Sequence, residues 1–124
     1  FEANFVNVDI NHRNSIMLSS LQGRRLGVWI AHGEGKFNFP YYKDKYNIAM
    51  SYSFGDYPGN PNGSDWNVAA ICSNDGRHLA MMPHIERAFL PWQWPYYPED
   101  RNNDEVSPWI EAFVNAFNWI KNNK

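Results

Sequence analysis

Cysteine is scarce in this chain, because Cys72 is the only one among 124 residues. A single cysteine excludes an internal disulfide framework and favours a reducing compartment, so we expect a cytoplasmic protein. The sequence also lacks a run of about 18 apolar residues, and we expect neither a membrane span nor a signal peptide. No basic run is present and the formal net charge is −2, so no nucleic-acid partner is predicted.

Aromatic residues, by contrast, are abundant at 17% of the chain, with six Trp, seven Tyr and eight Phe. Such a content indicates either a core dense in rings or a surface that meets something flat and apolar. With 44% hydrophobic and 19% charged residues, the composition is that of a globular protein. The length suffices for one domain but not for two.

The apolar pattern predicts about five strands, most of them antiparallel neighbours, followed by one terminal helix. We expect strands at residues 1–10, 26–30, 47–54, 68–72 and 78–82. The last two form a hairpin around Asp75-Gly76, a pair typical of tight turns. Residues 16–21 fit a short strand or a helical turn, and the prolines from Pro83 to Pro98 predict an irregular loop.

The terminal helix is predicted at residues 108–122. Ser107 is a good N-cap, and Pro108 suits the first helical position. Apolar residues then recur at helical spacing and predict a stripe that faces a core. The stripe consists of Ile110, Phe113, Val114, Phe117 and Ile120.

His84 and Glu86 are separated by one residue and directly follow the last predicted strand. In extended backbone, residues two apart point to the same side, about 7 Å apart at Cα. The carboxylate can therefore accept a hydrogen bond from one imidazole nitrogen, which leaves the other nitrogen free to act as general base and then as general acid. Taken alone, such a pair more often has a structural role.

His32 and Glu34 form a second pair of the same spacing, at the end of another predicted strand. We predict no metal, because the pair lacks helical spacing and one cysteine supplies no ligand cluster. His32 is expected either to bond loop backbone or to lie near a substrate. Cys72 ends a strand at a hairpin rather than a strained strand-to-helix turn, so we expect a small buried residue and not a nucleophile.

The stretch at residues 91–98 combines prolines with the rings of Trp92, Trp94, Tyr96 and Tyr97. It could bind a sugar or a peptide, but such clusters more often form loop cores or contacts between domains. Residues 60–64 form a turn in the first instance, and their amide groups could also lie at the mouth of a site.

Five segments, in this order, together resemble a known family. They are AHGEGKF at 31–37, NPNGS at 60–64, DGRHLAMMPHIERAF at 75–89, PWQWPYYP at 91–98 and SPWIEAFVNAF at 107–117. They are similar to the class I glutamine amidotransferase domain that closes the large single-chain phosphoribosylformylglycinamidine synthases. The resemblance covers nearly the whole chain.

The resemblance implies an α/β fold of the flavodoxin-like amidotransferase kind, of which residues 1–124 would be the C-terminal half of a single, truncated domain. This piece would supply an antiparallel extension, the strand bearing His84 and the closing helix. The resemblance further implies that His84 is the catalytic histidine and Glu86 the acid of a Cys-His-Glu triad. Residues that match family segments near the active site are His32, Gly33, Glu34, Asn60 and Asn62.

Enzymes of this family use ATP and glutamine to convert formylglycinamide ribonucleotide into its formamidine, a step of purine biosynthesis. Glutamine is hydrolysed through a cysteine thioester, and the ammonia passes to the synthetase domain of the same polypeptide. ATP and Mg would bind in other domains, so no cofactor is expected in this piece.

Two departures from the family pattern stand out. Ile85 lies between the triad residues, where the family usually has proline, whose ring would lock φ. The glycine-flanked nucleophile cysteine of the family would lie before Phe1, so we expect the chain alone to be inactive. The alternatives are a small aromatic-rich carbohydrate- or peptide-binding module without catalysis, a subunit whose partner supplies the cysteine, and hydrolysis through His84 and Cys72.

Overall fold

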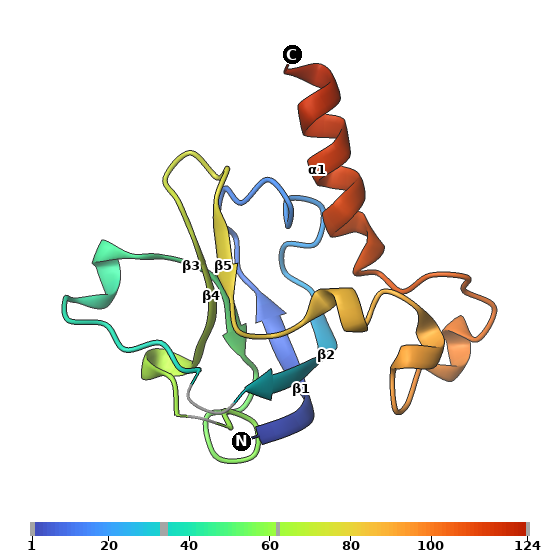
Figure 1. The fold of residues 1–124 in the computed structure, drawn as a ribbon, viewed down its shortest axis with the longest axis horizontal. Coiled ribbons are helices and arrows are strands. Elements are labelled where there is room, and N and C mark those ends of the chain that lie inside the picture. Colours follow the sequence, from blue (N-terminus) through green and yellow to red (C-terminus); the bar gives the residue numbers. More distant parts are fainter. Residues whose placement is uncertain (1, 33–34, 62, 124) are drawn as a thin grey trace.

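A five-stranded antiparallel sheet forms the centre of the computed structural model, which describes residues 2–32, 35–61 and 63–123 (Figure 1). The spatial order is β2-β1-β3-β4-β5. The strands are β1 (Glu2–Ile10), β2 (Arg25–His32), β3 (Asn47–Tyr52), β4 (Val68–Cys72) and β5 (Leu79–Met81), and the one α-helix, α1, spans Ile110–Asn122. The antiparallel strands and the single C-terminal helix confirm the predicted composition of the piece.

Alternation along the strands explains which face of the sheet is buried. On β1, Val6, Val8 and Ile10 are at most 5% exposed, while Asn7 between them is exposed. The same period of two, applied to β2 and β3, brings apolar side chains to a single core. Residues 16–23 cross this core as successive turns, without a strand, and bury Leu18 and Leu21.

The predicted hairpin between β4 and β5 is present, and its turn is tightly packed. The Gly76 amide donates to the Ser73 carbonyl at 3.0 Å, and Gly76 has a φ of +75°, which favours glycine. Its carbonyl accepts from the Ile16 amide at 3.0 Å. A Cβ at Gly76 would lie 1.9 Å from the Asn14 carbonyl oxygen. The turn therefore joins the hairpin to a segment about 60 residues earlier.

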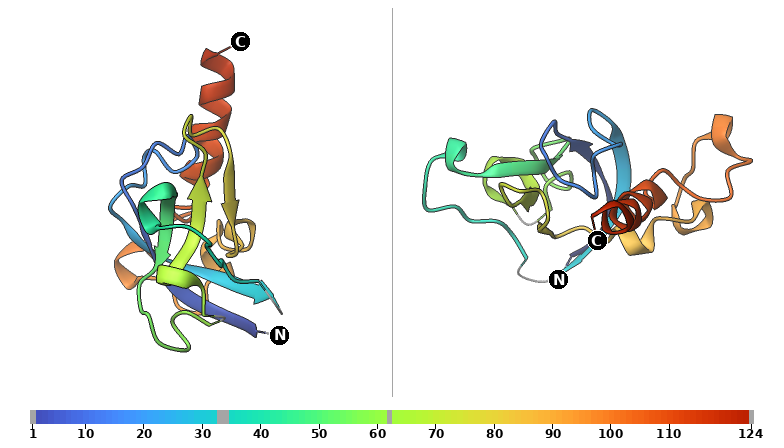
Figure 2. Two further views of the ribbon diagram at one scale, coloured as in Figure 1. Left: turned by 90° about the vertical axis from the view of Figure 1, so that its left-hand side faces the viewer. Right: turned by 90° about the horizontal axis from the view of Figure 1, so that it is seen from above.

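The start of α1 follows the predicted local chemistry, but the predicted orientation of its apolar stripe is wrong. The Ser107 hydroxyl accepts from the Trp109 amide at 3.3 Å, and helical pairing begins at Ile110. Phe117 and Ile120 are 66% and 60% exposed. The reason is that α1 meets the sheet only at its first turns and extends away from it (Figures 1 and 2). Within the helix, only Ala112 is buried.

Two irregular regions lie on opposite sides of the sheet, residues 36–46 on one side and residues 85–106 on the other (Figures 1 and 2). The second region contains the predicted proline-rich loop, which folds as short 3-10 turns at Ile85–Arg87, Pro91–Gln93 and Glu99–Arg101. Among the described residues, the structure contains no helix with the length and apolar character that a membrane crossing needs.

Candidate active site

His84 and Glu86 form a hydrogen-bonded pair at the end of the sheet. The imidazole Nδ1 lies 2.8 Å from Glu86 Oε1, and the two side chains are 33% and 55% exposed. The His84 amide donates to the Trp29 carbonyl of β2 at 2.8 Å, which attaches this residue to the sheet as an isolated bridge. The pair is therefore anchored through backbone and open to solvent at the side chains.

The backbone that brings the two side chains together differs from the predicted extended strand. His84 precedes a 3-10 turn at Ile85–Arg87, closed by the Arg87 amide donating to the His84 carbonyl at 3.1 Å. Side chains two residues apart approach each other in a tight turn as well as in a strand. The sequence spacing alone could not separate the two conformations.

Ile85, which lies where the resemblance predicts a proline, is compatible with this turn. It occupies the first position of the 3-10 turn, where an amide donor is not needed and where proline is tolerated. Its side chain is 7% exposed and belongs to the core. Burial of an apolar side chain thus anchors the turn where a proline would have fixed φ.

The hydrogen bond to Glu86 determines what the imidazole of His84 can do. A carboxylate only accepts, so Nδ1 carries the proton and Nε2 presents a lone pair. Within the described part of the chain, Nε2 has no hydrogen-bond partner. This arrangement can take a proton from a nucleophile at Nε2 and stabilise the resulting imidazolium through the carboxylate.

Cys72 does not complete a triad with this pair. It pairs with Leu79 at the start of β5, whereas His84 follows the other end of that strand. The thiol lies 3.9 Å from Asn14 Oδ1, and burial raises its pKa, the opposite of what a reactive thiolate needs. The thiol is partly rather than fully buried, but its surroundings agree with the predicted structural role.

The predicted neighbours of the site fall into two groups. Gly33, Glu34 and Asn62 lie outside the described residues, and His32 is the last residue of β2, its backbone paired with that of β1. Asn60 is 6% exposed and bonds its own loop. Its Oδ1 accepts from the Ser64 amide at 3.1 Å, while its Nδ2 donates to the Ser64 carbonyl at 3.0 Å.

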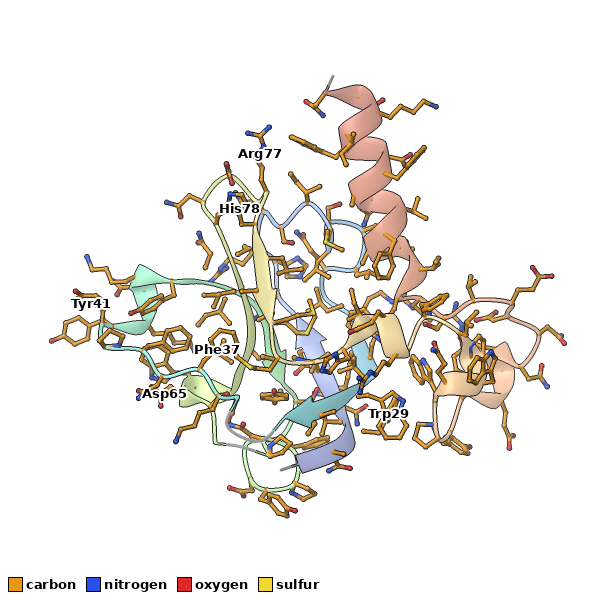
Figure 3. All side chains as sticks on the ribbon, in the orientation of Figure 1. Trp29, Phe37, Tyr41, Asp65, Arg77 and His78 are labelled. Atoms are coloured by element: carbon orange, nitrogen blue, oxygen red, sulfur yellow. The ribbon has the colours of Figure 1, made fainter. Side chains whose placement is uncertain are left out.

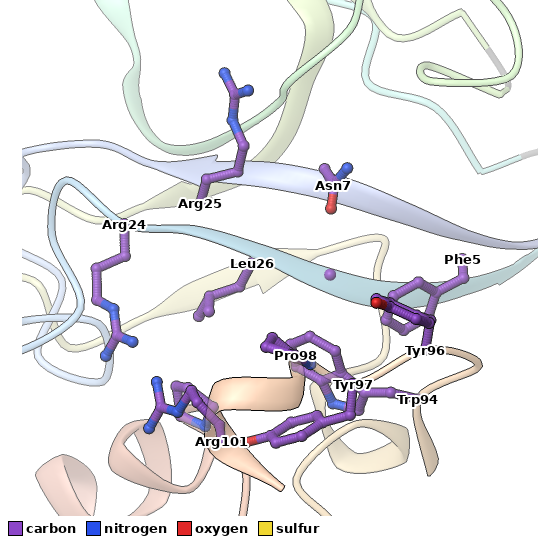
Figure 4. Close-up of a pocket in the computed structure, with 12 residues that line it drawn as sticks. Phe5, Asn7, Arg24, Arg25, Leu26, Trp94, Tyr96, Tyr97, Pro98 and Arg101 are labelled. Atoms are coloured by element: carbon purple, nitrogen blue, oxygen red, sulfur yellow. The ribbon is translucent and has the colours of Figure 1, made fainter. Parts of the chain in front are cut away.

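A groove of about 490 Å³ lies away from the pair, between β1–β2 and residues 94–101 (Figure 4). Three arginines line it, and each has an acidic neighbour. Arg25 Nε donates to Asp9 Oδ1 at 2.7 Å. Arg24 Nη1 is 3.5 Å from Glu111 Oε2. Arg101 Nε donates to Asp104 Oδ2 at 2.8 Å. Because each arginine is paired with a carboxylate, the groove offers no chemistry comparable to that of the His84 pair.

The rings of the 91–98 stretch divide into packed and exposed ones. The Trp94 indole donates to the Ala88 carbonyl at 2.7 Å and packs against Tyr97 at 5.0 Å. The Tyr97 hydroxyl donates to Asp104 at 2.7 Å, and burial, followed by this bond, raises the pKa of Tyr97 to about 12. Trp92 is 78% exposed. Tyr96 is 72% exposed, so two of the four rings build the loop and the other two lie on the surface.

Metal binding has no candidate in the described ranges. Across residues 2–32, 35–61 and 63–123, no three His, Cys, Asp or Glu side chains gather closely enough to hold a metal ion.

One residue beside the pair went unnoticed in the sequence. Trp29 supplies the carbonyl that binds the His84 amide, and its indole donates to the Gln93 carbonyl at 2.7 Å. Its partners lie more than 50 residues further along the chain, so no local pattern reveals them. The available signal was a tryptophan inside a short apolar strand directly before the AHGEG segment.

An imidazole oriented by a carboxylate, with one nitrogen open, has the geometry that acid–base chemistry needs. The chain belongs to the CobB/CobQ-like glutamine amidotransferase domain family, whose model matches residues 1–120. This membership confirms the family resemblance of the sequence.

Individual relatives agree with this membership. The chain is 44% identical, over 98% of its length, to a probable phosphoribosylformylglycinamidine synthase, chloroplastic/mitochondrial, of Arabidopsis thaliana. It is 41% identical, over 96% of its length, to the phosphoribosylformylglycinamidine synthase of Homo sapiens. It spans only 10% of each of these relatives.

The fold also matches a solved structure. The structure of PurLQS from Thermotoga maritima aligns with a TM-score of 0.70 at 22% identity, covering 96% of this chain and 48% of that one. At this identity the likeness shows the fold alone, and the matched region is about half of the PurLQS chain.

Proposed function

We propose that this chain contributes the histidine and the acid of a Cys-His-Glu triad to the amidotransferase part of a phosphoribosylformylglycinamidine synthase. The observation that carries the proposal is the 2.8 Å contact between His84 Nδ1 and Glu86 Oε1, with Nε2 left open. Membership of a glutamine amidotransferase family supports glutamine as the substrate.

The proposed chemistry follows from the hydrogen bond that occupies Nδ1 of His84 and leaves Nε2 open. Nε2 takes the proton of a cysteine thiol supplied by another part of the complete protein, and the thiolate attacks the side-chain amide carbon of glutamine. The C–N bond breaks as the imidazolium returns the proton to the leaving nitrogen, which departs as ammonia. Water, activated by the same imidazole, then cleaves the thioester to glutamate and free thiol.

Glu86 has a supporting role in these steps. Its carboxylate keeps the proton of the neutral imidazole on Nδ1 and stabilises the imidazolium that forms after the first transfer. Glu86 would therefore lower the barrier without touching glutamine. Its removal should cost less activity than the removal of His84.

The wider setting is part of the same proposal. The ammonia would pass to the synthetase part of the same polypeptide, where ATP and Mg would drive the amidation of formylglycinamide ribonucleotide. The names and lengths of the relatives support this setting. The free thiol of Cys72 supports a cytoplasmic location.

Ammonia release from glutamine by the complete polypeptide tests the proposal. We expect His84→Ala to lower kcat by about three orders of magnitude or more, and Glu86→Ala to lower it by less. Synthesis supported by added ammonia should survive both changes, because the synthetase site is untouched. Unchanged glutamine hydrolysis in both variants would show that the pair is structural.

The cysteine in this chain supplies the control. Cys72→Ala in the complete polypeptide should leave glutamine hydrolysis unchanged, and the 124-residue chain by itself should release no ammonia from glutamine. Activity of the chain alone that disappears in Cys72→Ala would instead make Cys72 the nucleophile.

A further inference from the structure

Trp29 contacts both ends of the segment that carries the His84–Glu86 pair. Its carbonyl accepts from the His84 amide at 2.8 Å, and its indole Nε1 donates to the Gln93 carbonyl at 2.7 Å. Both ends of residues 84–93 are therefore hydrogen-bonded to a single residue of β2. Figure 3 shows Trp29 on the side of the sheet where this segment lies.

The middle of this segment is held by other residues, Trp94 and Ser107. Ala88 is fully buried, and its carbonyl accepts from the Trp94 indole at 2.7 Å and from the Ser107 hydroxyl at 2.5 Å. The Trp29 and Trp94 rings both pack against Phe5, at 5.1 and 5.4 Å. With its ends held by Trp29 and its middle bound to the core, the segment cannot shift along the sheet edge.

The His84 side chain itself has no comparable support. It is 33% exposed, and in the described residues its one hydrogen bond is that to Glu86, which is 55% exposed. An exposed carboxylate alone holds an imidazole loosely, so this hydrogen bond depends on where the backbone places the two side chains. The position of its backbone is thus what determines whether Nδ1 and Oε1 meet.

We propose that Trp29 is a positioning residue for His84. By pairing its carbonyl with the His84 amide and its indole N–H with the Gln93 carbonyl, it holds both ends of the segment whose 3-10 turn at Ile85–Arg87 brings Nδ1 and Oε1 together. It acts through His84 and does not touch glutamine. The catalytic part of this inference rests on the proposed function, whereas the effect on the imidazole does not.

The chain offers a matched control for this test. Trp92 belongs to the same turn region, is also a tryptophan, and is 78% exposed. Trp29→Phe removes the N–H and keeps a ring, and Trp92→Phe makes the same chemical change at an exposed ring. Replacement of Trp29 by benzothienylalanine, which keeps the shape of the indole but has no N–H, isolates the hydrogen bond from the packing.

The first measurement is nitrogen NMR of the 124-residue chain with labelled histidine. We expect His84 in the unchanged chain and in Trp92→Phe to give one tautomer protonated at Nδ1. In Trp29→Phe and in the benzothienylalanine variant, the two ring nitrogens should move towards the values of averaged tautomers. A His84 spectrum identical in all four proteins would overturn the inference, whatever becomes of glutamine hydrolysis.

The second measurement is the kinetics of glutamine hydrolysis by the complete polypeptide. We expect Trp29→Phe to lower kcat about tenfold with KM changed less than about twofold, because a supporting residue acts on the chemical step. Trp92→Phe should match the unchanged enzyme. If His84→Ala abolishes hydrolysis while Trp29→Phe equals Trp92→Phe, only this inference fails; if His84→Ala has no effect, the proposed function fails.

Discussion

The molecule contains two regions rich in aromatic rings, and they are built in different ways. Beyond β3 and β4, a ring cluster consists of Phe37, Phe39, Tyr46 and Trp66. Its side chains contact one another ring on ring, while the backbone of Phe37 and Phe39 is hydrogen-bonded to Ser64 and Asp65; Phe37, Tyr41 and Asp65 mark this side in Figure 3. Beyond β2, the indole group of Trp29, Trp94 and Trp109 donates three N–H bonds to main-chain carbonyls, each at 2.7–2.8 Å.

The difference separates packing from positioning. Phe39 and Trp66 stack with centroids 5.2 Å apart and planes 7° apart, a contact that tolerates sliding. A hydrogen bond weakens steeply with angle, so an indole N–H fixes its partner in distance and direction. The indole group surrounds the segment with His84 and Glu86, where a small shift matters.

The largest contrast is expected between Trp109 and Trp66. Trp109 is fully buried and its indole donates to the Gly27 carbonyl at 2.8 Å, whereas Trp66 is 39% exposed. Trp109→Ala should lower the free energy of unfolding by about 3–5 kcal/mol. Trp66→Ala should lower it by about 1 kcal/mol. Urea denaturation with an unchanged m-value measures both, and equal losses would remove the distinction between the two regions.

A cycle at Ala88 tests the hydrogen bonds of the indole group. The buried Ala88 carbonyl accepts from both Trp94 and Ser107. Trp94→Phe and Ser107→Ala should each cost about 1 kcal/mol, because the other donor remains. The double variant should cost more than the sum, since the buried carbonyl then has neither of these donors. Strict additivity in the two-variant cycle would mean that packing alone holds the loop.

The ring cluster contains backbone strain that the indole group lacks. Trp66 has a φ of +52°, a left-handed conformation that costs a residue with a side chain about 1 kcal/mol. Glycine removes both the ring and the strain, while alanine removes the ring alone. Trp66→Gly should therefore be more stable than Trp66→Ala by about 1 kcal/mol, the reverse of the usual order. The melting temperatures of the two variants test this prediction. A lower melting temperature for Trp66→Gly than for Trp66→Ala would show that the backbone at Trp66 is not strained.

The smallest effect concerns Tyr97, at alkaline pH. Burial and the bond to Asp104 raise the pKa of Tyr97 to about 12 in the folded chain, above the ordinary value of about 10. Its contribution to stability is therefore fully present below pH 10 and is lost as the pH rises towards 12. In Tyr97→Phe, urea midpoints measured from pH 9 to pH 12 should fall less steeply than in the unchanged chain. If the urea midpoints of both proteins fell equally with pH, the raised pKa of Tyr97 would be refuted.

Local chemistry was the part of the fold that the sequence predicted well. Alternation along β1 and the Asp75-Gly76 turn depend on neighbouring residues, and both predictions hold. Ser107 and Pro108 likewise place the start of α1 within two residues. The helical spacing in α1 predicted an apolar face but not what this face contacts. Spacing alone does not determine whether another element covers Phe117, which is exposed.

The candidate site was predictable only as a pair. The one-residue spacing of His84 and Glu86 brings their side chains together in either a strand or a tight turn, so the pairing was predicted although the backbone was not. The contribution of Trp29 depends on partners at positions 84 and 93, brought close by the sheet. Such long-range contacts require the topology, which residue patterns alone do not determine.

The turn at Gly76 has a consequence for how the sequence can vary. Exposed hairpin tips usually accept many substitutions, but here any side chain would collide with the Asn14 carbonyl and would need a positive φ. In a library of single substitutions, position 76 should accept glycine alone. Arg77 next to it is exposed, with its guanidinium 4.7 Å from the centre of the Trp119 ring, and should accept a wider range of residues. Substitution at this tip is therefore restricted most strongly at the glycine itself.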